Sequence, residues 1–305
     1  MKKVCSFLPA ATNMIKTLGL EHLLYGVTFE CPIDRPRVIQ SSLHDQNLSA
    51  DEINELIAKH KKEDTTVNTI DEDLLLKIKP DIIFTQAICN VCQIGENDVN
   101  NVLKKLPFNA KIFSLNPKSL TAVLDDIYTV AKACGYPEKG EALIATLQET
   151  TRKIEDTLNY HNRAVKNCTF FEWMNPTFNC GHWIPEQLQI AGGYDALANP
   201  NGYSYPIDVT QNPDYNPEII IFSACGMSLT QSITEVTNVL SNPFWKNLKA
   251  YKNKQIWIVD GNLFTQPGPD LIKGAQLLAS IFNPDIFEFP KELKEKYTQY
   301  QTPKL

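Results

Sequence analysis

The sequence predicts an α/β protein of two βα lobes with mostly parallel sheets, joined by a single long rigid helix. Short apolar runs alternate with helical patterns through residues 4–115, and the same alternation resumes after residue 164. Between these stretches lies the longest helical pattern in the chain. We therefore expect an N-terminal lobe at residues 1–118, a helical segment at residues 119–163 and a C-terminal lobe at residues 164–284. Residues 285–305 are expected to form a peripheral tail rich in Lys and Glu.

In the N-terminal lobe, short apolar runs bounded by turn and capping residues predict the strands. These runs are residues 4–8, 24–29, 37–39, 81–85 and 111–115. The stretch from Ser49 to Glu52 is a capping box that opens a helix reaching residue 62. Asp71 caps a second helix, which ends before Pro80. Two further helices are expected at residues 11–18 and 97–106.

The long helical pattern occupies residues 137–162 and follows another helix at residues 119–134. Pro137 stands in its first turn, where proline is well tolerated. A helix of about 25 residues is ~37 Å long, which suits a strut between two lobes. The alternative is an ordinary crossover helix with a long tail. The apolar residues on this helix form a narrow stripe: Leu143, Ile144, Leu147, Ile154 and Leu158.

The C-terminal lobe repeats the alternation with strands at residues 169–173, 218–222 and 255–259. Helices are expected at residues 184–191, 229–240 and 269–282. No flexible Gly/Ser linker joins the lobes, so the pattern predicts a cleft between them whose walls move little.

Length and charge exclude several classes of protein. The chain has 305 residues, more than a single core usually supports. Its net charge is −6, and no basic stripe interleaved with aromatics is present, so we expect no nucleic-acid partner. No apolar run approaches the ~18 residues of a membrane span. Residues 4–8 fit a first strand better than an export signal, so we expect a cytoplasmic monomer, or a periplasmic or extracellular one if a leader has been removed.

Chemically useful side chains follow the expected strands. If the sheets are parallel, most of these side chains face one cleft, because ligands collect beyond the carboxyl ends of parallel strands. The candidate ligand-binding residues are Phe29, Glu30, Cys31, Cys89, Cys92, Glu172, Trp173, Gly181, His182 and Trp183.

The Cys89-x-x-Cys92 pair has several interpretations. One interpretation is half of a zinc site, but no second half with zinc-ribbon spacing follows in the chain, so a zinc ribbon is not expected. The pair also resembles a redox pair, although thioredoxin-like folds place that motif early in a short chain. A disulfide within the pair would close the site to metal. A bare-metal site for Zn or another transition metal would combine thiolate, imidazole and carboxylate ligands: Cys89, Cys92, His182 and Glu172, with Cys31 as an alternative to Glu172.

The two carboxylates Glu30 and Glu172 each stand beside an aromatic residue. They are candidates for metal ligands, for hydrogen-bond acceptors, or for an acid–base pair whose pKa is raised by burial. The spacing does not select among these roles. No hydrolase elbow, P-loop or dinucleotide-binding motif is present, so an enzyme is the less favoured reading. Because fold does not fix function, a metal-dependent enzyme on this scaffold stays open.

Five segments together carry a family resemblance: residues 4–12 (VCSFLPAAT), 25–32 (YGVTFECP), 80–86 (PDIIFTQ), 181–186 (GHWIPE) and 267–269 (PGP). The chain resembles the ABC-transporter substrate-binding proteins for cobalamin and ferric siderophores from residue 4 to about 284, and most of all their cobalamin-binding branch. The resemblance implies a periplasmic-binding-protein-like fold of the helical-backbone type. It also implies cobalamin or a related corrinoid as ligand, held between the lobes by Phe29, Trp173, His182 and Trp183.

The same resemblance implies an ABC transporter permease as partner for delivery of a small-molecule metal chelate. Family members that dock on a permease use an exposed acidic residue on each lobe. Glu96 stands at a suitable place in the first lobe, whereas residues 226–231 of the second lobe contain no carboxylate. Two alternatives remain beside the corrinoid-binding interpretation. They are a cytosolic transition-metal-binding protein and a metal-dependent enzyme.

Overall fold

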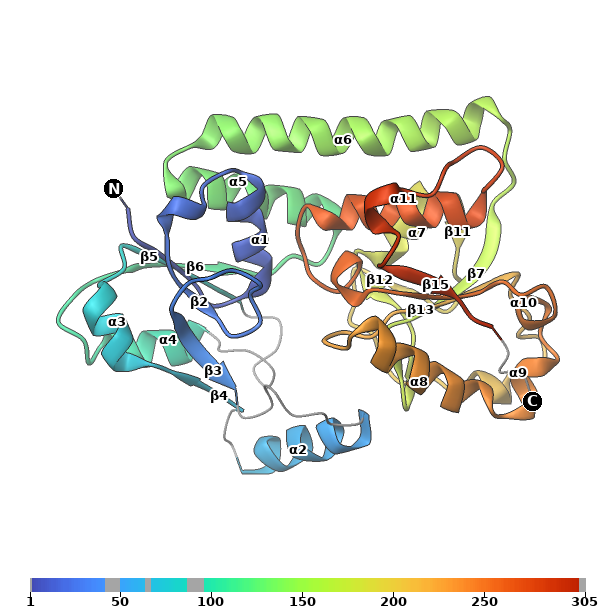
Figure 1. The fold of residues 1–305 in the computed structure, drawn as a ribbon, viewed down its shortest axis with the longest axis horizontal. Coiled ribbons are helices and arrows are strands. Elements are labelled where there is room, and N and C mark those ends of the chain that lie inside the picture. The colour runs from blue at the N-terminus through green and yellow to red at the C-terminus, as the bar shows by residue number, and fades with distance from the viewer. Residues whose placement is uncertain (1, 42–49, 64–66, 87–95, 302–305) are drawn as a thin grey trace. The chain divides into compact units, whose positions relative to one another are not determined.

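The computed structural model describes residues 2–41, 50–63, 67–86 and 96–301 (Figure 1). The chain forms two compact units. Unit 1 comprises Met1–Pro117 and Leu124–Ile144, and unit 2 comprises Lys118–Val123 and Ala145–Leu305. The division falls inside helix α6 (Pro137–Tyr160), which is continuous over 24 residues. The prediction of two α/β lobes joined by a single long helix is confirmed.

The described part of unit 1 contains a six-stranded sheet in the order β4-β3-β2-β1-β5-β6. Neighbouring strands are parallel except for β3 and β4, which are antiparallel. The strands are β1 (Val4–Ser6), β2 (Leu24–Thr28), β3 (Arg37–Ser41), β4 (Asn68–Ile70), β5 (Ile82–Gln86) and β6 (Lys111–Leu115). The short strand β4 was not predicted from the sequence.

Helices cover both faces of this sheet. Helices α1 (Pro9–Thr17) and α5 (Leu120–Cys134) lie on one face, and α3 (Glu72–Ile78) and α4 (Glu96–Leu103) lie on the other (Figure 1). Helix α2 (Ala50–Lys62) and a short 3₁₀ helix, η1 (Glu21–Leu23), complete the described helices of unit 1. Asp71 caps α3 as predicted, because its Oδ1 accepts a hydrogen bond from Leu74 N at 2.8 Å.

The core between this sheet and helices α3 and α4 is built from alternate residues of the strands. Cys5 and Ile83 are register partners on β1 and β5, and both are fully buried. Burial raises the pKa of the Cys5 thiol to about 12, which leaves it protonated and inert at neutral pH. The other buried members of this core are Phe7, Val38, Ile39, Leu75, Ile78 and Val99.

The main sheet of unit 2 has five strands in the order β11-β7-β13-β14-β15. The first four are parallel, and β15 runs antiparallel to β14. The strands are β7 (Lys166–Phe171), β11 (Gly193–Tyr194), β13 (Ile219–Phe222), β14 (Ile256–Val259) and β15 (Tyr297–Gln299). The expectation that residues 285–305 are peripheral was wrong for β15, which pairs Trp257 with Gln299 at the edge of the sheet.

Helices α7 (Ile184–Ile190) and α11 (Asp270–Phe282) pack on each other on one face of this sheet, and α8 (Leu229–Leu240) lies on the other (Figure 1). Phe171 and Phe222 stack at 5.1 Å between ring centroids in the core beside α8. The remaining described helices are short: α9 (Pro243–Lys246), α10 (Lys249–Lys252), η2 (Val209–Gln211), η3 (Gly261–Leu263) and η4 (Lys291–Leu293). Within the described ranges, no helix is both long and apolar enough to cross a membrane.

The chain leaves the carboxyl end of β7 earlier than predicted and forms two small ladders. Strands β8 (Trp173–Met174) and β9 (Thr177–Phe178) pair antiparallel, and β10 (Gly181–His182) pairs in parallel with β12 (Asn199–Pro200). These ladders bring Glu172, Gly181 and His182 together at this end of unit 2.

Candidate functional site

Glu172 is the first residue after β7, and its side chain is mostly buried. Its Oε1 accepts a hydrogen bond from Gly181 N at 2.7 Å. Burial raises the pKa of this carboxyl to about 7, and hydrogen bonds from Gly181 N and the Ser204 hydroxyl oppose that rise. Glu172 therefore changes charge near neutral pH and ties the end of β7 to β10.

The backbone of His182 is held in an uncommon conformation. Its φ is +54°, in the left-handed region that most residues avoid. Its N–H donates to Gly202 O at 2.6 Å, and its carbonyl accepts from Asn201 N at 3.2 Å. A Cβ at position 181 would lie 2.6 Å from Gly202 O, so this approach requires glycine there. The ladder thus fixes the backbone from which the imidazole projects.

The imidazole of His182 lies among aromatic rings. Its centroid is 5.2 Å from that of Trp183 and 5.2 Å from that of Tyr203, which it meets edge-on. The Nε2 atom is buried and has no hydrogen-bond partner among the described residues. Burial lowers the pKa of this imidazole, and the charge of Lys118 lowers it further. At neutral pH the ring is uncharged, which is the form that binds metals.

Around His182 the structure adds residues that the sequence did not single out. Tyr203 and Tyr205 are about half exposed, at 50% and 48%. The Lys118 ammonium lies 5.7 Å from the centroid of the Tyr203 ring. The loop that carries these tyrosines is anchored by Asn179, whose Oδ1 accepts from Tyr205 N at 2.8 Å. A signal in the sequence is the pair of tyrosines in the turn-rich stretch at residues 201–206.

Trp173 and Trp183 lie differently. The Trp173 ring is half-buried, and its Nε1 donates to Asn175 O at 3.1 Å in the hairpin of β8 and β9. Trp183 is only 4% exposed, and its Nε1 donates to Phe264 O at 2.6 Å. Trp183 therefore anchors the start of α7 inside unit 2, while Trp173 keeps part of its ring at the surface.

The candidates of unit 1 follow β2. Phe29 is half-buried against the core beside α3, and Glu30 is exposed. Cys31 is buried, and its Sγ donates to Thr12 Oγ1 at 3.1 Å. Burial raises the pKa of this thiol to about 11, so it is protonated at neutral pH and does not supply a thiolate.

Cys89 and Cys92 lie outside the described residues, so neither their oxidation state nor their part in a metal site is described. Of the expected bare-metal ligands, Glu172 and His182 of unit 2 are described, as is the alternative Cys31 of unit 1. Among the described residues, no group of three or more His, Cys, Asp and Glu side chains could hold a metal ion. What the described site offers a metal is one neutral imidazole beside aromatic rings.

The expected permease-docking positions are described only in part. Glu96 begins α4, but its side chain lies outside what is described. In unit 2, the start of α8 forms a capping box in which Ser228 and Gln231 bond each other reciprocally. This segment presents an amide and a hydroxyl, and residues 226–231 contain no carboxylate.

Comparison with known proteins places this geometry in context. A model of the family described as Periplasmic binding protein matches residues 39–263. The chain is 20% identical over 295 residues to the uncharacterized ABC transporter substrate-binding lipoprotein YvrC of Bacillus subtilis, covering 94% of this chain and 82% of that protein. It is 25% identical over 212 residues to the Fe(3+)-citrate-binding protein YfmC of the same organism, covering 66% of this chain and 61% of that protein.

Solved structures share the fold. A periplasmic heme-binding protein from Pseudomonas aeruginosa superposes with a TM-score of 0.69 at 15% identity, covering 99% of this chain and 98% of its own. The periplasmic vitamin B12-binding protein BtuF of Vibrio cholerae gives a TM-score of 0.63 at 18% identity, covering 93% of this chain and 97% of its own. These likenesses extend over nearly the whole chain and agree with the two-unit α/β architecture.

Proposed function

The chain belongs to the periplasmic binding protein family, and from that premise we propose that it is the substrate-binding component of an ABC transporter for a metal chelate. A cobalamin-like corrinoid is the first candidate ligand. The motif at residues 181–186 and the other segments that resemble the cobalamin-binding branch support this choice.

The observation that carries the proposal is the imidazole of His182. Buried polar atoms in proteins almost always have a hydrogen-bond partner, so an Nε2 that has none among the described residues supports a ligand at this position. Because burial and Lys118 lower its pKa, the ring keeps a lone pair available at neutral pH. A neutral imidazole is a common axial ligand of chelated cobalt and iron. His182 would bind the metal from one side while the chelator fills its other positions.

The surroundings of His182 fit the body of such a chelate. Tyr203 meets the imidazole edge-on and is half exposed, so it offers aromatic surface, which packs well on a flat macrocycle. Tyr203 contacts the imidazole and is half exposed, so the ligand would move this ring aside to reach Nε2. The Lys118 ammonium beside Tyr203 would pair with an acidic substituent of the chelate.

Relatives and structural neighbours support the ligand class without fixing the ligand. Their names report binding of vitamin B12, of heme and of Fe(3+)-citrate, which are all metal chelates. Heme is the second candidate, because its carboxylates would suit Lys118 and its iron would suit His182. YvrC is named a lipoprotein, which supports the periplasmic or extracellular location over the cytoplasmic one.

The test is a titration of the purified protein with hydroxocobalamin, hemin and ferric citrate, followed by visible absorption. We expect hydroxocobalamin to give a saturable shift of its corrin bands. A His182→Ala variant should bind at least ten-fold more weakly and without the shift. His161→Ala removes an exposed imidazole of the same unit and should bind like the unmodified protein.

Three outcomes count against parts of the proposal. A shift with hemin alone would refute the corrinoid and keep the chelate function. No spectral change with any of the three chelates would refute the function itself. Equal binding by the His182→Ala variant would remove His182 from the site. Elemental analysis of the purified protein distinguishes the bare-metal alternative, which requires about one bound metal ion without a chelator.

A further inference from the structure

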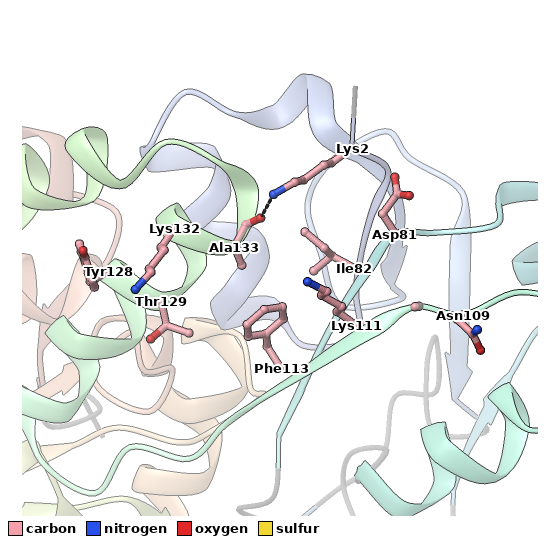
Figure 2. A pocket seen from close by; sticks show the side chains of 11 residues that line it. Lys2, Asp81, Ile82, Asn109, Lys111, Phe113, Tyr128, Thr129, Lys132 and Ala133 are labelled. Atoms are coloured by element: carbon pink, nitrogen blue, oxygen red, sulfur yellow. Dashed lines mark hydrogen bonds between the residues drawn. The ribbon is translucent and has the colours of Figure 1, made fainter.

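Unit 1 contains a hollow that belongs to neither the predicted site nor the chelate proposal. It lies on the α5 face of the sheet beside the edge strand β6, and its volume is about 1050 Å³ (Figure 2). Its wall includes the amino ends of three adjacent strands, because Lys2 precedes β1, Asp81 precedes β5 and Lys111 begins β6. The expected ligand residues of unit 1 follow the carboxyl ends of strands instead. The hollow is as large as sites that take small molecules, which measure roughly 300–1,000 Å³.

Positive charge lines this hollow. Lys2, Lys111 and Lys132 contribute three ammonium groups, against the single carboxylate of Asp81. That carboxylate is already engaged, because its Oδ2 accepts a hydrogen bond from Lys3 N at 2.7 Å. A positive lining is the reverse of the whole chain, which has a net charge of −6. The hollow would therefore attract an anion.

The three lysines differ in how they are held. Lys2 Nζ donates to Ala133 O at 2.6 Å, near the end of α5. Lys132 Nζ lies 5.7 Å from the centroid of the Tyr128 ring, one turn earlier on the same helix. Lys111 is the first residue of the edge strand β6, and its side chain is exposed at the rim of the hollow.

The floor of the hollow is apolar. Ile82 is 3% exposed, and the half-buried Phe113 ring packs on Phe84 with 5.6 Å between centroids. In Figure 2 the Phe113 ring lies between the Lys111 and Lys132 side chains. A small inorganic anion would leave this floor unused, and a neutral hydrocarbon would leave the lysines unused. Only a molecule with both parts would use the whole lining.

We propose that this hollow is a second binding site, for an organic anion with an apolar body, such as a medium-chain carboxylate or an aromatic sulfonate. The acidic group lies against Lys111 and Lys132, and the apolar body covers Phe113 and Ile82. The site is complete within unit 1 and does not depend on the proposed chelate function.

The probe for this site is 8-anilinonaphthalene-1-sulfonate, whose fluorescence rises when its rings leave water. We expect saturable one-to-one binding by the purified full-length protein. Lys111→Glu with Lys132→Glu should weaken this binding at least ten-fold. The matched control is Lys77→Glu with Lys104→Glu, which reverses two exposed lysines of unit 1 that do not line the hollow and should stay within two-fold. Thermal melting of each variant verifies that it is folded.

Competition defines the class of ligand. Decanoate should displace the probe, and inorganic phosphate at the same concentration and ionic strength should not. The proposal is overturned if the Lys111→Glu/Lys132→Glu protein binds the probe with unchanged affinity, or if decanoate fails to compete. Displacement by phosphate as strong as that by decanoate also overturns it, because the apolar floor would then contribute nothing.

Discussion

The Glu172 carboxylate makes a hydrogen bond at the candidate site, but burial makes its negative charge unfavourable. It accepts the Gly181 N–H and so ties β7 to β10, next to His182. Burial nevertheless opposes its charge and raises its pKa from 4.5 to about 7. The folded state therefore holds the Glu172 proton more tightly than the unfolded chain does. This proton binding stabilises the folded state fully below pH 4.5, and the stabilisation is lost as the pH rises through about 7.

We predict that Glu172→Gln gains thermal stability over the unmodified protein as the pH is raised from 5 to 8. Glutamine keeps an oxygen for Gly181 N–H and removes the buried charge, so the difference in melting temperature should grow across that range. Thermal unfolding at both pH values measures it. Glu295→Gln changes an exposed carboxylate and should show no such trend. A difference for Glu172→Gln that is the same at both pH values would contradict the assigned pKa.

At this scale the sequence identified some positions of the candidate site and missed others. Glu172 and His182 were predicted because they follow strands, and the structure joins the Glu172 side chain to Gly181, the residue before His182. Trp183 and Cys31 were selected by the same rule but are buried, since position along the chain does not tell which way a side chain points. Lys118 could not be predicted to approach Tyr203, because that contact depends on tertiary folding.

Strand β15 shows the limit of composition at the scale of single elements. Its residues lie in a tail rich in Lys and Glu, which looked peripheral in the sequence. In the structure, Tyr300 N donates to Ile256 O at 2.8 Å, and Asp260 N donates to Lys296 O at 2.8 Å. A three-residue strand carries almost no periodic signal, so only its pairing with β14 defines it.

We predict that Tyr300→Pro unfolds at lower denaturant concentration than Tyr300→Ala. Both variants lose the ring that packs near Tyr251, but only proline also removes the N–H that bonds Ile256 O. The additional loss should be about 1–3 kcal/mol, the usual effect of an unsatisfied buried partner. Urea unfolding followed by circular dichroism measures both. Equal stability of the two variants would mean that the end of β15 contributes no pairing energy.

Elements with their own start and stop signals were predicted well. Helix α3 begins after its Asp71 cap and ends at Ile78 as expected, and α8 matches its predicted bounds. The two-residue ladders β8–β9 and β10–β12 were missed, although they position the candidate site. Strands of two residues are too short to show an alternation of apolar and polar residues, so the local sequence cannot predict them.

On the scale of the whole molecule, each unit has a core of its own. Ile83 is fully buried between the sheet of unit 1 and helices α3 and α4, and Phe222 is fully buried beside Phe171 and Trp245 in unit 2. Alternating strand and helix patterns predicted this division, because each lobe contains enough apolar strands to form its own sheet. The interleaving of the units at residues 118–123 was not predicted, because the sequence places those residues within one continuous helix.

We predict that core truncations loosen the two units selectively. Ile83→Ala should cost about 2–5 kcal/mol and raise amide hydrogen exchange mainly in the strands of unit 1. Phe222→Ala should cost about 3–5 kcal/mol and act mainly on the strands of unit 2. Hydrogen exchange followed by mass spectrometry measures where each variant exchanges faster than the unmodified protein. If either variant accelerates exchange evenly along the chain, the units do not unfold as separate cooperative bodies.

The interleaved chain path also dictates when each unit can be finished during synthesis. The last residue that unit 1 needs is Ile144, so its core can close while the rest of the protein is still being made. Unit 2 needs Lys118–Val123, which precede most of its residues, and β15, which is more than 150 residues beyond Ile144. At about 5–20 residues per second, unit 2 waits roughly 8–30 s after unit 1 has everything it needs. Until β15 has been synthesised, β14 has no neighbour on its outer edge and exposes unpaired backbone groups.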